Sequence, residues 1–225
     1  MKVGTDGVLI GAWASIPSGG GRMLDIGTGC GLIALMLAQR SGPEWQSDAI
    51  DLDNAAAEQA RDNFATSPWR DRLHAYPASL QDWASDTARH GTYRLIVSNP
   101  PYFRNALKNP DDGRRTARHT DCLSFDDLLH CSAVLLQEDG LLALILSAEA
   151  EDDILRQAST YSLYPVRLCH VHSRMNKPAK RILIELQHRS ALSVNEMVTP
   201  AILCLEPSDA PESADYARLV KDFYL

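Results

Sequence analysis

Cysteine is scarce in this sequence, and long hydrophobic runs are absent. The five cysteines are dispersed over 225 residues and form no CxxC pair. An odd, scattered set indicates free thiols in a reducing compartment and gives no support for a zinc site. No apolar run approaches the ~20 residues that a membrane helix needs. The N-terminal apolar patch is interrupted by Asp6 and Gly11, so we expect folded structure there instead of a signal peptide. We therefore predict a cytoplasmic, monomeric protein with no membrane partner and no metal.

Positively charged residues are also fewer than negatively charged ones. The sequence has 22 basic and 29 acidic residues, which gives a formal net charge of −7. That balance argues against nucleic-acid binding, yet the basic residues gather in two stretches. Residues 102–119 hold five of them against two acids, and residues 174–181 hold four and no acid. Either stretch alone is most simply a solvated loop, but two in an acidic protein favour a polyanion site. The basic residues concerned are Arg104, Lys108, Arg114, Arg115, Arg118, Arg174, Lys177, Lys180 and Arg181.

Short apolar stretches alternate with helical patterns along the chain. Strands are predicted at 23–26, 47–52, 73–78, 93–98, 141–147, 165–172 and 181–187. Helices are predicted at 31–40, 53–66, 124–140 and 149–161. Such alternation indicates a parallel sheet with helices on both faces, and the short loop before the last strand favours an antiparallel pair at one edge. The predicted fold is α/β, a Rossmann-like, seven-stranded, mostly parallel sheet with an antiparallel edge strand.

The C-terminal part of the chain has a different composition. Residues 190–211 are mixed and proline-bearing, and residues 214–225 have the apolar spacing of a last helical turn. We therefore predict one domain over residues 1–189, followed by a tail over residues 190–225 that docks on it.

The stretch DIGTGCG, Asp25 to Gly31, lies between a predicted strand and a predicted helix. Its glycines permit a tight turn and close backbone approach to a ligand beside a helix N-terminus. A dinucleotide fingerprint would need glycine at position 32, which is leucine here. The Asp25 carboxylate suits an ammonium group better than a pyrophosphate, and Asp51 ends the next strand, where it can accept from two ribose hydroxyls. A cationic amino acid joined to a nucleoside without phosphates is S-adenosylmethionine, the predicted cofactor.

The remaining cofactor contacts follow from this assignment. Adenine is expected near the end of the third strand, and the first helix is expected to close over the cofactor, with helix capping as the alternative role of its first residues. Asp53 is predicted to cap the next helix. The predicted cofactor-binding residues are Asp25, Gly27, Thr28, Gly29, Gly31, Asp51, Leu52, Ser79, Leu80, Thr5 and Asp6.

The fourth predicted strand runs directly into Asn-Pro-Pro-Tyr-Phe, residues 99–103. Consecutive prolines remove two backbone donors and force an extended path, so the stretch forms a rigid turn. DIGTGCG, Asp51 and NPPY together resemble the class I S-adenosylmethionine-dependent methyltransferases that modify planar amino or amide nitrogens. KVGTDGVLIGAW, SNPPYF, KRILIEL and KDFYL are similar, more narrowly, to a bacterial family that methylates N6 of adenine-37 in a valine tRNA.

This resemblance implies a tRNA partner and roles for the Asn-Pro-Pro-Tyr turn. The Asn99 side-chain oxygen and the Pro100 carbonyl would accept from the adenine amino group and direct its lone pair at the methyl group, without a strong base. Tyr102 would stack on the flipped base and Phe103 would line the pocket. The residues expected to grip RNA phosphates are Arg104, Lys108, Arg114, Arg115, Arg118, Lys177, Lys180 and Arg181.

The sequence departs from this family in two places. Relatives usually carry further residues before KVGTDG, which begins here at Lys2, so we expect either a truncated chain or a different start, with the possible loss of a lid over the cofactor. Relatives often have an acidic residue that accepts from the amino group of the cofactor's adenine. This chain has Ser79 at that position, and its hydroxyl is a weaker acceptor than a carboxylate. Two other functions remain open, a protein-glutamine methyltransferase and a non-catalytic module that binds RNA or protein.

Overall fold

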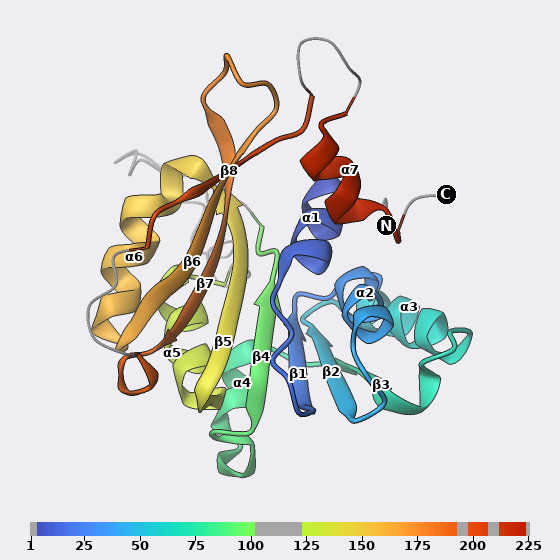
Figure 1. Ribbon diagram of the computed structural model, residues 1–225. Coiled ribbons are helices and arrows are strands. Elements are labelled where there is room, and N and C mark those ends of the chain that lie inside the picture. The colour runs from blue at the N-terminus through green and yellow to red at the C-terminus, as the bar shows by residue number, and fades with distance from the viewer. Residues whose placement is uncertain (1–3, 102–122, 193–197, 207–211, 224–225) are drawn as a thin grey trace, which may run out of the picture.

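The computed structural model describes residues 4–101, 123–192, 198–206 and 212–223 (Figure 1). The strands are β1 (Gly21–Ile26), β2 (Trp45–Asp51), β3 (Leu73–Pro77), β4 (Tyr93–Ser98), β5 (Leu136–Ser147), β6 (Leu163–His172), β7 (Ala179–His188) and β8 (Ala201–Cys204). The helices are α1 (Thr5–Trp13), α2 (Leu32–Arg40), α3 (Asn54–Ala65), α4 (Leu80–Ser85), α5 (Phe125–Leu135), α6 (Glu151–Thr160) and α7 (Ala214–Val220).

The strands form one sheet in the order β3-β2-β1-β4-β5-β7-β6-β8. β7 is antiparallel to both of its neighbours, and the other pairings are parallel. The predicted α/β class, the mostly parallel sheet and the antiparallel pair of β6 and β7 are confirmed. The predicted count of seven strands is wrong, because the described residues form an eight-stranded sheet. β8 has four residues, of which only Leu203 is buried, so it carries too little alternation to be recognised from sequence.

Side chains of the central strands alternate between two cores on opposite faces of the sheet. In β5, Leu142 and Leu144 pack in a core with α4, α5 and α6, whereas Ala143 and Ile145 pack in a core with α1, α2 and α7. A strand that is buried on both faces reads as a continuous apolar run, which is how residues 141–147 appear in the sequence. α7 therefore docks beside α1 on the face opposite α5 (Figure 1).

The predicted start of one helix is confirmed, and the predicted end of another is wrong. Asp53 caps α3 as expected, since its Oδ1 accepts from the Ala55 amide at 2.9 Å. The helix predicted over 124–140 begins after Ser124 as expected but ends at Leu135, and β5 begins at Leu136. Leu136 adopts an extended backbone and pairs with Tyr93 in β4. The stabilisation that strand pairing gives these residues therefore exceeds their preference for continuing the helix.

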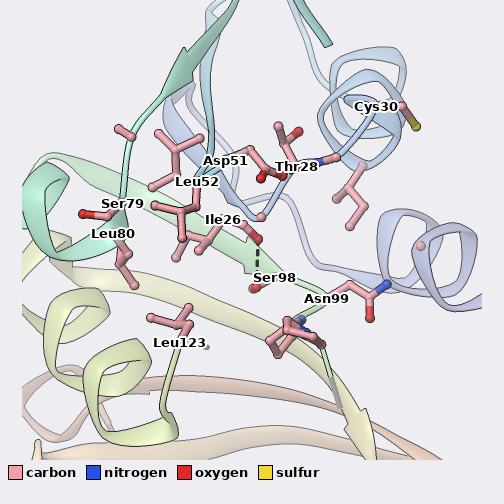
Figure 2. Close-up of a pocket in the computed structure, with 18 of the residues that line it drawn as sticks. Ile26, Thr28, Cys30, Asp51, Leu52, Ser79, Leu80, Ser98, Asn99 and Leu123 are labelled. Carbon is pink, nitrogen blue, oxygen red and sulfur yellow. Dashed lines mark hydrogen bonds between the residues drawn. The ribbon is translucent and has the colours of Figure 1, made fainter. Parts of the chain in front are cut away.

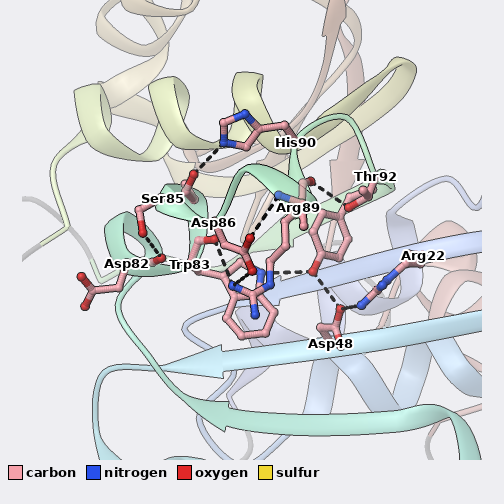
Figure 3. Close-up of polar contacts among 12 residues, drawn as sticks. Arg22, Asp48, Asp82, Trp83, Ser85, Asp86, Arg89, His90 and Thr92 are labelled. Atoms are coloured by element: carbon pink, nitrogen blue, oxygen red, sulfur yellow. Dashed lines mark hydrogen bonds and ion pairs between the residues drawn. The ribbon is translucent and has the colours of Figure 1, made fainter.

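A buried polar network ties α4 to the sheet (Figure 3). The Tyr93 hydroxyl donates to Asp48 Oδ2 at 2.7 Å and accepts from Trp83 Nε1 at 3.1 Å, and Arg22 pairs with the same Asp48 oxygen. The Arg89 guanidinium stacks on the Trp83 ring, 3.7 Å from its centroid. Burial and the Asp48 carboxylate raise the pKa of Tyr93, so its hydroxyl remains a donor. α4 is thereby fixed at the point where the chain leaves β3.

Tyr93→Phe is expected to lower the free energy of unfolding by about 2 kcal/mol, because it leaves the buried Trp83 N–H without an acceptor and removes a donor from a buried carboxylate. Urea denaturation of the purified protein measures the change. Tyr164→Phe is the matched control, since the Tyr164 hydroxyl makes no such hydrogen bond among the described contacts. Equal stability losses for the two variants would contradict the assigned role of the network.

Candidate active site

A cavity of about 520 Å³ opens at the carboxyl ends of β1, β2 and β4 (Figure 2). The strand order reverses between β1 and β4, which is the usual location of a ligand site in an open parallel sheet. The walls come from the glycine loop, the ends of β2 and β4 and the start of α4. Gly4 and Gly7 contribute a further wall at the start of α1.

The glycine loop lines the cavity with backbone. The amides of Gly27 and Thr28 both donate to the Ile50 carbonyl, at 2.9 and 3.0 Å, so the loop is fixed to the end of β2. Gly31 follows at φ +83°, and a Cβ there would lie 2.5 Å from Cε1 of Phe64 in α3. Glycine is thus required at position 31 by both its backbone conformation and its packing. Of the predicted loop residues, Gly27, Thr28 and Gly29 line the cavity, and Gly31 shapes the turn behind them.

Asp51 is placed at the cavity and its orientation is set by backbone donors. Its Oδ2 accepts from the Gly29 amide at 2.8 Å and its Oδ1 accepts from the Asp53 amide at 3.0 Å. Each carboxylate oxygen has a further lone pair, so both can also accept from the hydroxyls of a ribose. Leu52 lines the same wall and is 61% exposed, which offers apolar surface to a nucleoside.

Asp25, in contrast, is fully buried and is not among the residues that line the cavity. Its Oδ2 accepts from Thr28 Oγ1 at 2.6 Å and from the Ala34 amide at 3.3 Å, which joins the glycine loop to α2. Its Oδ1 is buried without a hydrogen-bond partner in the described part of the chain. Burial raises the pKa of Asp25 to about 7, and the nearby Asp51 charge adds to this. The predicted contact of Asp25 with an ammonium group therefore remains a prediction.

The raised pKa makes Asp25 a source of pH-dependent stability. The folded protein holds this proton more tightly than the unfolded chain, whose carboxyl has a pKa near 3.8. The free energy of unfolding should therefore fall as the pH rises from about 4 to about 7 and level off above it. Asp25→Asn is expected to remove this contribution, on the order of 4 kcal/mol, while its amide oxygen can still accept from Thr28. Urea unfolding at pH 5 and at pH 8 tests this, and an unchanged pH dependence in the variant would refute it.

Ser79 and Leu80 line the cavity at the start of α4, as predicted for adenine recognition. The Ser79 hydroxyl also caps this helix, since it accepts from the Asp82 amide at 3.0 Å and donates to Asp82 Oδ2 at 2.7 Å. One lone pair is left for a ligand. α4 was not predicted, although Ser79 and Asp82 have the Ser-x-x-acid spacing of a capping box. Gln81 and Leu123 line the cavity and were not predicted either.

Asn99 and Pro100 line the cavity on the side of β4, opposite the start of α4. The preceding Ser98 is fully buried and donates through Oγ to the Ile26 carbonyl at 2.9 Å (Figure 2). This bond joins the end of β4 to the end of β1 directly before the glycine loop. Asn99 and the glycine loop therefore hold fixed positions relative to one another. The predicted residues Tyr102, Phe103, Arg104, Lys108, Arg114, Arg115 and Arg118 lie outside the described residues.

The other predicted residues differ in their contacts within the described part of the chain. Thr5 and Asp6 are in the first turn of α1 but are not among the lining residues. Asp6 Oδ2 pairs with Arg181 Nε at 3.2 Å. Lys177 and Lys180 form no ion pair with another described residue, so these two charges stay available to an anionic ligand. Arg174, in the same hairpin, pairs with Glu206 at 3.1 Å.

This chain is similar to known proteins in both sequence and fold. Residues 9–157 match the family described as methyltransferase small domain. A tRNA1(Val) (adenine(37)-N6)-methyltransferase of Parabacteroides distasonis is 48% identical over all of this chain and 91% of its own length. A protein of the same name from Pectobacterium carotovorum is 41% identical over all of this chain and 88% of its own length. A predicted O-methyltransferase from Agrobacterium tumefaciens, 16% identical, superposes with a TM-score of 0.74 over 96% of both chains, which shows a shared fold.

The described residues contain neither a candidate membrane-spanning helix nor a candidate metal site. None of the helices there is long and apolar enough to cross a membrane. No group of three or more histidine, cysteine, aspartate or glutamate side chains in the same part of the chain could hold a metal ion.

Proposed function

Because this chain belongs to the methyltransferase small domain family and, within it, to the bacterial tRNA1(Val) (adenine(37)-N6)-methyltransferases, we propose that it transfers a methyl group from S-adenosylmethionine to N6 of adenine-37 in tRNA1(Val). The observation that carries this proposal is one cavity lined by Asp51, the glycine loop and Asn99. We expect the protein to act in the cytoplasm as a monomer and without a metal ion.

The residues present fit this cofactor. Asp51 offers two carboxylate oxygens to ribose hydroxyls, and the loop at Gly27–Gly29 has no side chain larger than threonine to obstruct the amino-acid end. Leu52 and Leu80 supply apolar surface for the adenine. When bound, S-adenosylmethionine supplies an electrophilic methyl group on a sulfonium. The chain's task is then to hold the acceptor nitrogen on the line of attack.

We assign this positioning to Asn99 and Pro100. The lone pair of an adenine amino nitrogen is delocalised into the ring, which makes it a weak nucleophile. Acceptors on its two hydrogens, the Asn99 side-chain oxygen and the Pro100 carbonyl, favour a pyramidal nitrogen whose lone pair faces the methyl group. The proton leaves to solvent after transfer, because the methylated nitrogen is then strongly acidic, and no strong base is needed. Tyr102 is proposed to stack on the base, and Phe103 to line its pocket.

The proposed RNA contacts lie outside this cavity. Lys177 in the loop between β6 and β7 and Lys180 at the start of β7, with the basic residues of 104–118, would bind phosphates and set the position of the anticodon loop. Because phosphate contacts carry no sequence information, the choice of adenine rests on the pocket.

The test is methyl transfer from labelled S-adenosylmethionine to total tRNA from cells that lack the endogenous enzyme, followed by digestion and identification of the labelled nucleoside. Label in N6-methyladenosine of tRNA1(Val) is the expected result. In a parallel reaction with cell protein in place of tRNA, label in glutamine would favour the protein methyltransferase alternative. Cofactor binding with no transfer to any substrate would favour the non-catalytic alternative.

A further inference from the structure

α1 is attached to β7 at both of its ends. Near its start, Asp6 Oδ2 pairs with Arg181 Nε at 3.2 Å. Just after its end, Glu185 accepts from the Ser15 amide at 2.6 Å and from Ser15 Oγ at 3.0 Å. Arg181 and Glu185 are four residues apart on one face of β7, about 13 Å. The two attachments therefore join the start of α1 and the residue after its C-cap to the same face of β7.

The attachment at Ser15 is a buried one. Glu185 is 2% exposed, and Arg167 lies beside it, with Nη1 3.5 Å from Glu185 Oε1. The same guanidinium stacks on the Trp13 ring, 3.8 Å from its centroid, and donates to the Trp13 carbonyl at 3.0 Å. The end of α1 thus has several mutually supporting contacts to β6 and β7.

The start of α1 borders the cavity and is joined to β7 by the Asp6–Arg181 ion pair. Its N-cap is Gly4, which makes no side-chain cap hydrogen bond. The first turn of such a helix tends to fray, because its amides lack partners. Gly4 and Gly7, on either side of the Asp6 ion pair, line the cavity. Loss of this turn would remove one cavity wall.

β7 brings Arg181 to the same edge of the sheet as the cavity. β7 runs antiparallel to β5, and Arg181 pairs in register with Ser147 at the carboxyl end of β5. Both members of the ion pair are partly shielded, with side chains 28% and 25% exposed. An ion pair in such a site is stronger than one in full solvent.

We infer that Arg181 is a positioning residue for the cofactor: through its ion pair with Asp6 it holds the first turn of α1 in place as a wall of the cofactor cavity. This differs from the role in RNA binding that its basic stretch suggests. The inference rests on the proposed function, since it assumes that the cavity holds the cofactor.

The experiment is a double-mutant cycle of Arg181→Gln and Asp6→Asn, read out by calorimetric binding of S-adenosylhomocysteine. Each single variant should raise the Kd about two- to fivefold, and the double variant should raise it no further than either single one. Amide hydrogen exchange of residues 5–8 in the ligand-free protein should become faster in all three. Arg181→Lys, which keeps the charge, should restore most of the affinity. The KM for tRNA should be unchanged.

Lys180→Gln is the matched control, one residue away and without an ion pair to a described residue. It should raise the KM for tRNA and leave S-adenosylhomocysteine binding and hydrogen exchange unaltered. If Arg181→Gln behaves like Lys180→Gln, or if the two single effects add, the inference is wrong. A protein that binds S-adenosylhomocysteine but methylates no tRNA would refute the proposed substrate, and the binding and exchange measurements would still decide the role of Arg181.

Discussion

Asn99→Ala is expected to reduce kcat for tRNA methylation by about 10²- to 10³-fold, the range seen when one preorganised polar contact to a reacting group is removed. Asn99 lines the cavity beside Pro100, at the end of a strand that Ser98 fixes to the glycine loop. The substitution therefore removes an acceptor for the adenine amino group and leaves the cavity walls that contact the cofactor intact. The measurement is single-turnover transfer to tRNA with saturating cofactor.

Two controls make this prediction specific. The Kd of S-adenosylhomocysteine should be the same in Asn99→Ala as in the wild type, because the proposed contact is to the substrate base. Asn54→Ala, at the exposed start of α3, should have wild-type kcat. If the Asn99→Ala variant has nearly the kcat of the wild-type protein, Asn99 has no part in the proposed mechanism.

Asp51→Ala is expected to weaken S-adenosylhomocysteine binding about 100-fold. The substitution removes both proposed acceptors for the ribose hydroxyls, and charge-assisted hydrogen bonds contribute about 1.5–3 kcal/mol each. It also removes the acceptors of the Gly29 and Asp53 amides, whose nitrogens lie 2.8 and 3.0 Å from the Asp51 carboxylate oxygens. Calorimetry measures the Kd, and kcat at saturating cofactor should change far less than the Kd.

Asp53→Ala is the matched control for Asp51, two residues further along the chain. Asp53 caps α3 through the Ala55 amide, so its loss should lower the free energy of unfolding by about 1 kcal/mol. It should leave the Kd almost unchanged. Equal losses of affinity in the two variants would show that the helix cap, and not the ribose contact, governs binding.

Several features could be predicted because their signals are local. The continuous apolar run of residues 141–147, the cap at Asp53 and the turn at the glycine loop each depend on neighbours within a few residues. The predicted cluster of the glycine loop, Asp51 and Asn99 also forms, because the carboxyl ends of parallel strands meet at one edge of the sheet. The misjudged elements are short or ambiguous: β8 has four residues, and the pattern after Leu135 fits either a helix or a strand.

The sequence by itself therefore determined the α/β class, the position of the cavity and nine of the 21 residues that line it. Only the tertiary structure decided how individual charged side chains are used. It buried Asp25 behind the loop, assigned the Ser79 hydroxyl to a helix cap, and paired Arg181 with Asp6, 175 residues away in the chain. The physical reason is that periodicity and capping report the local backbone, whereas the partner of a charge depends on which distant elements pack against it.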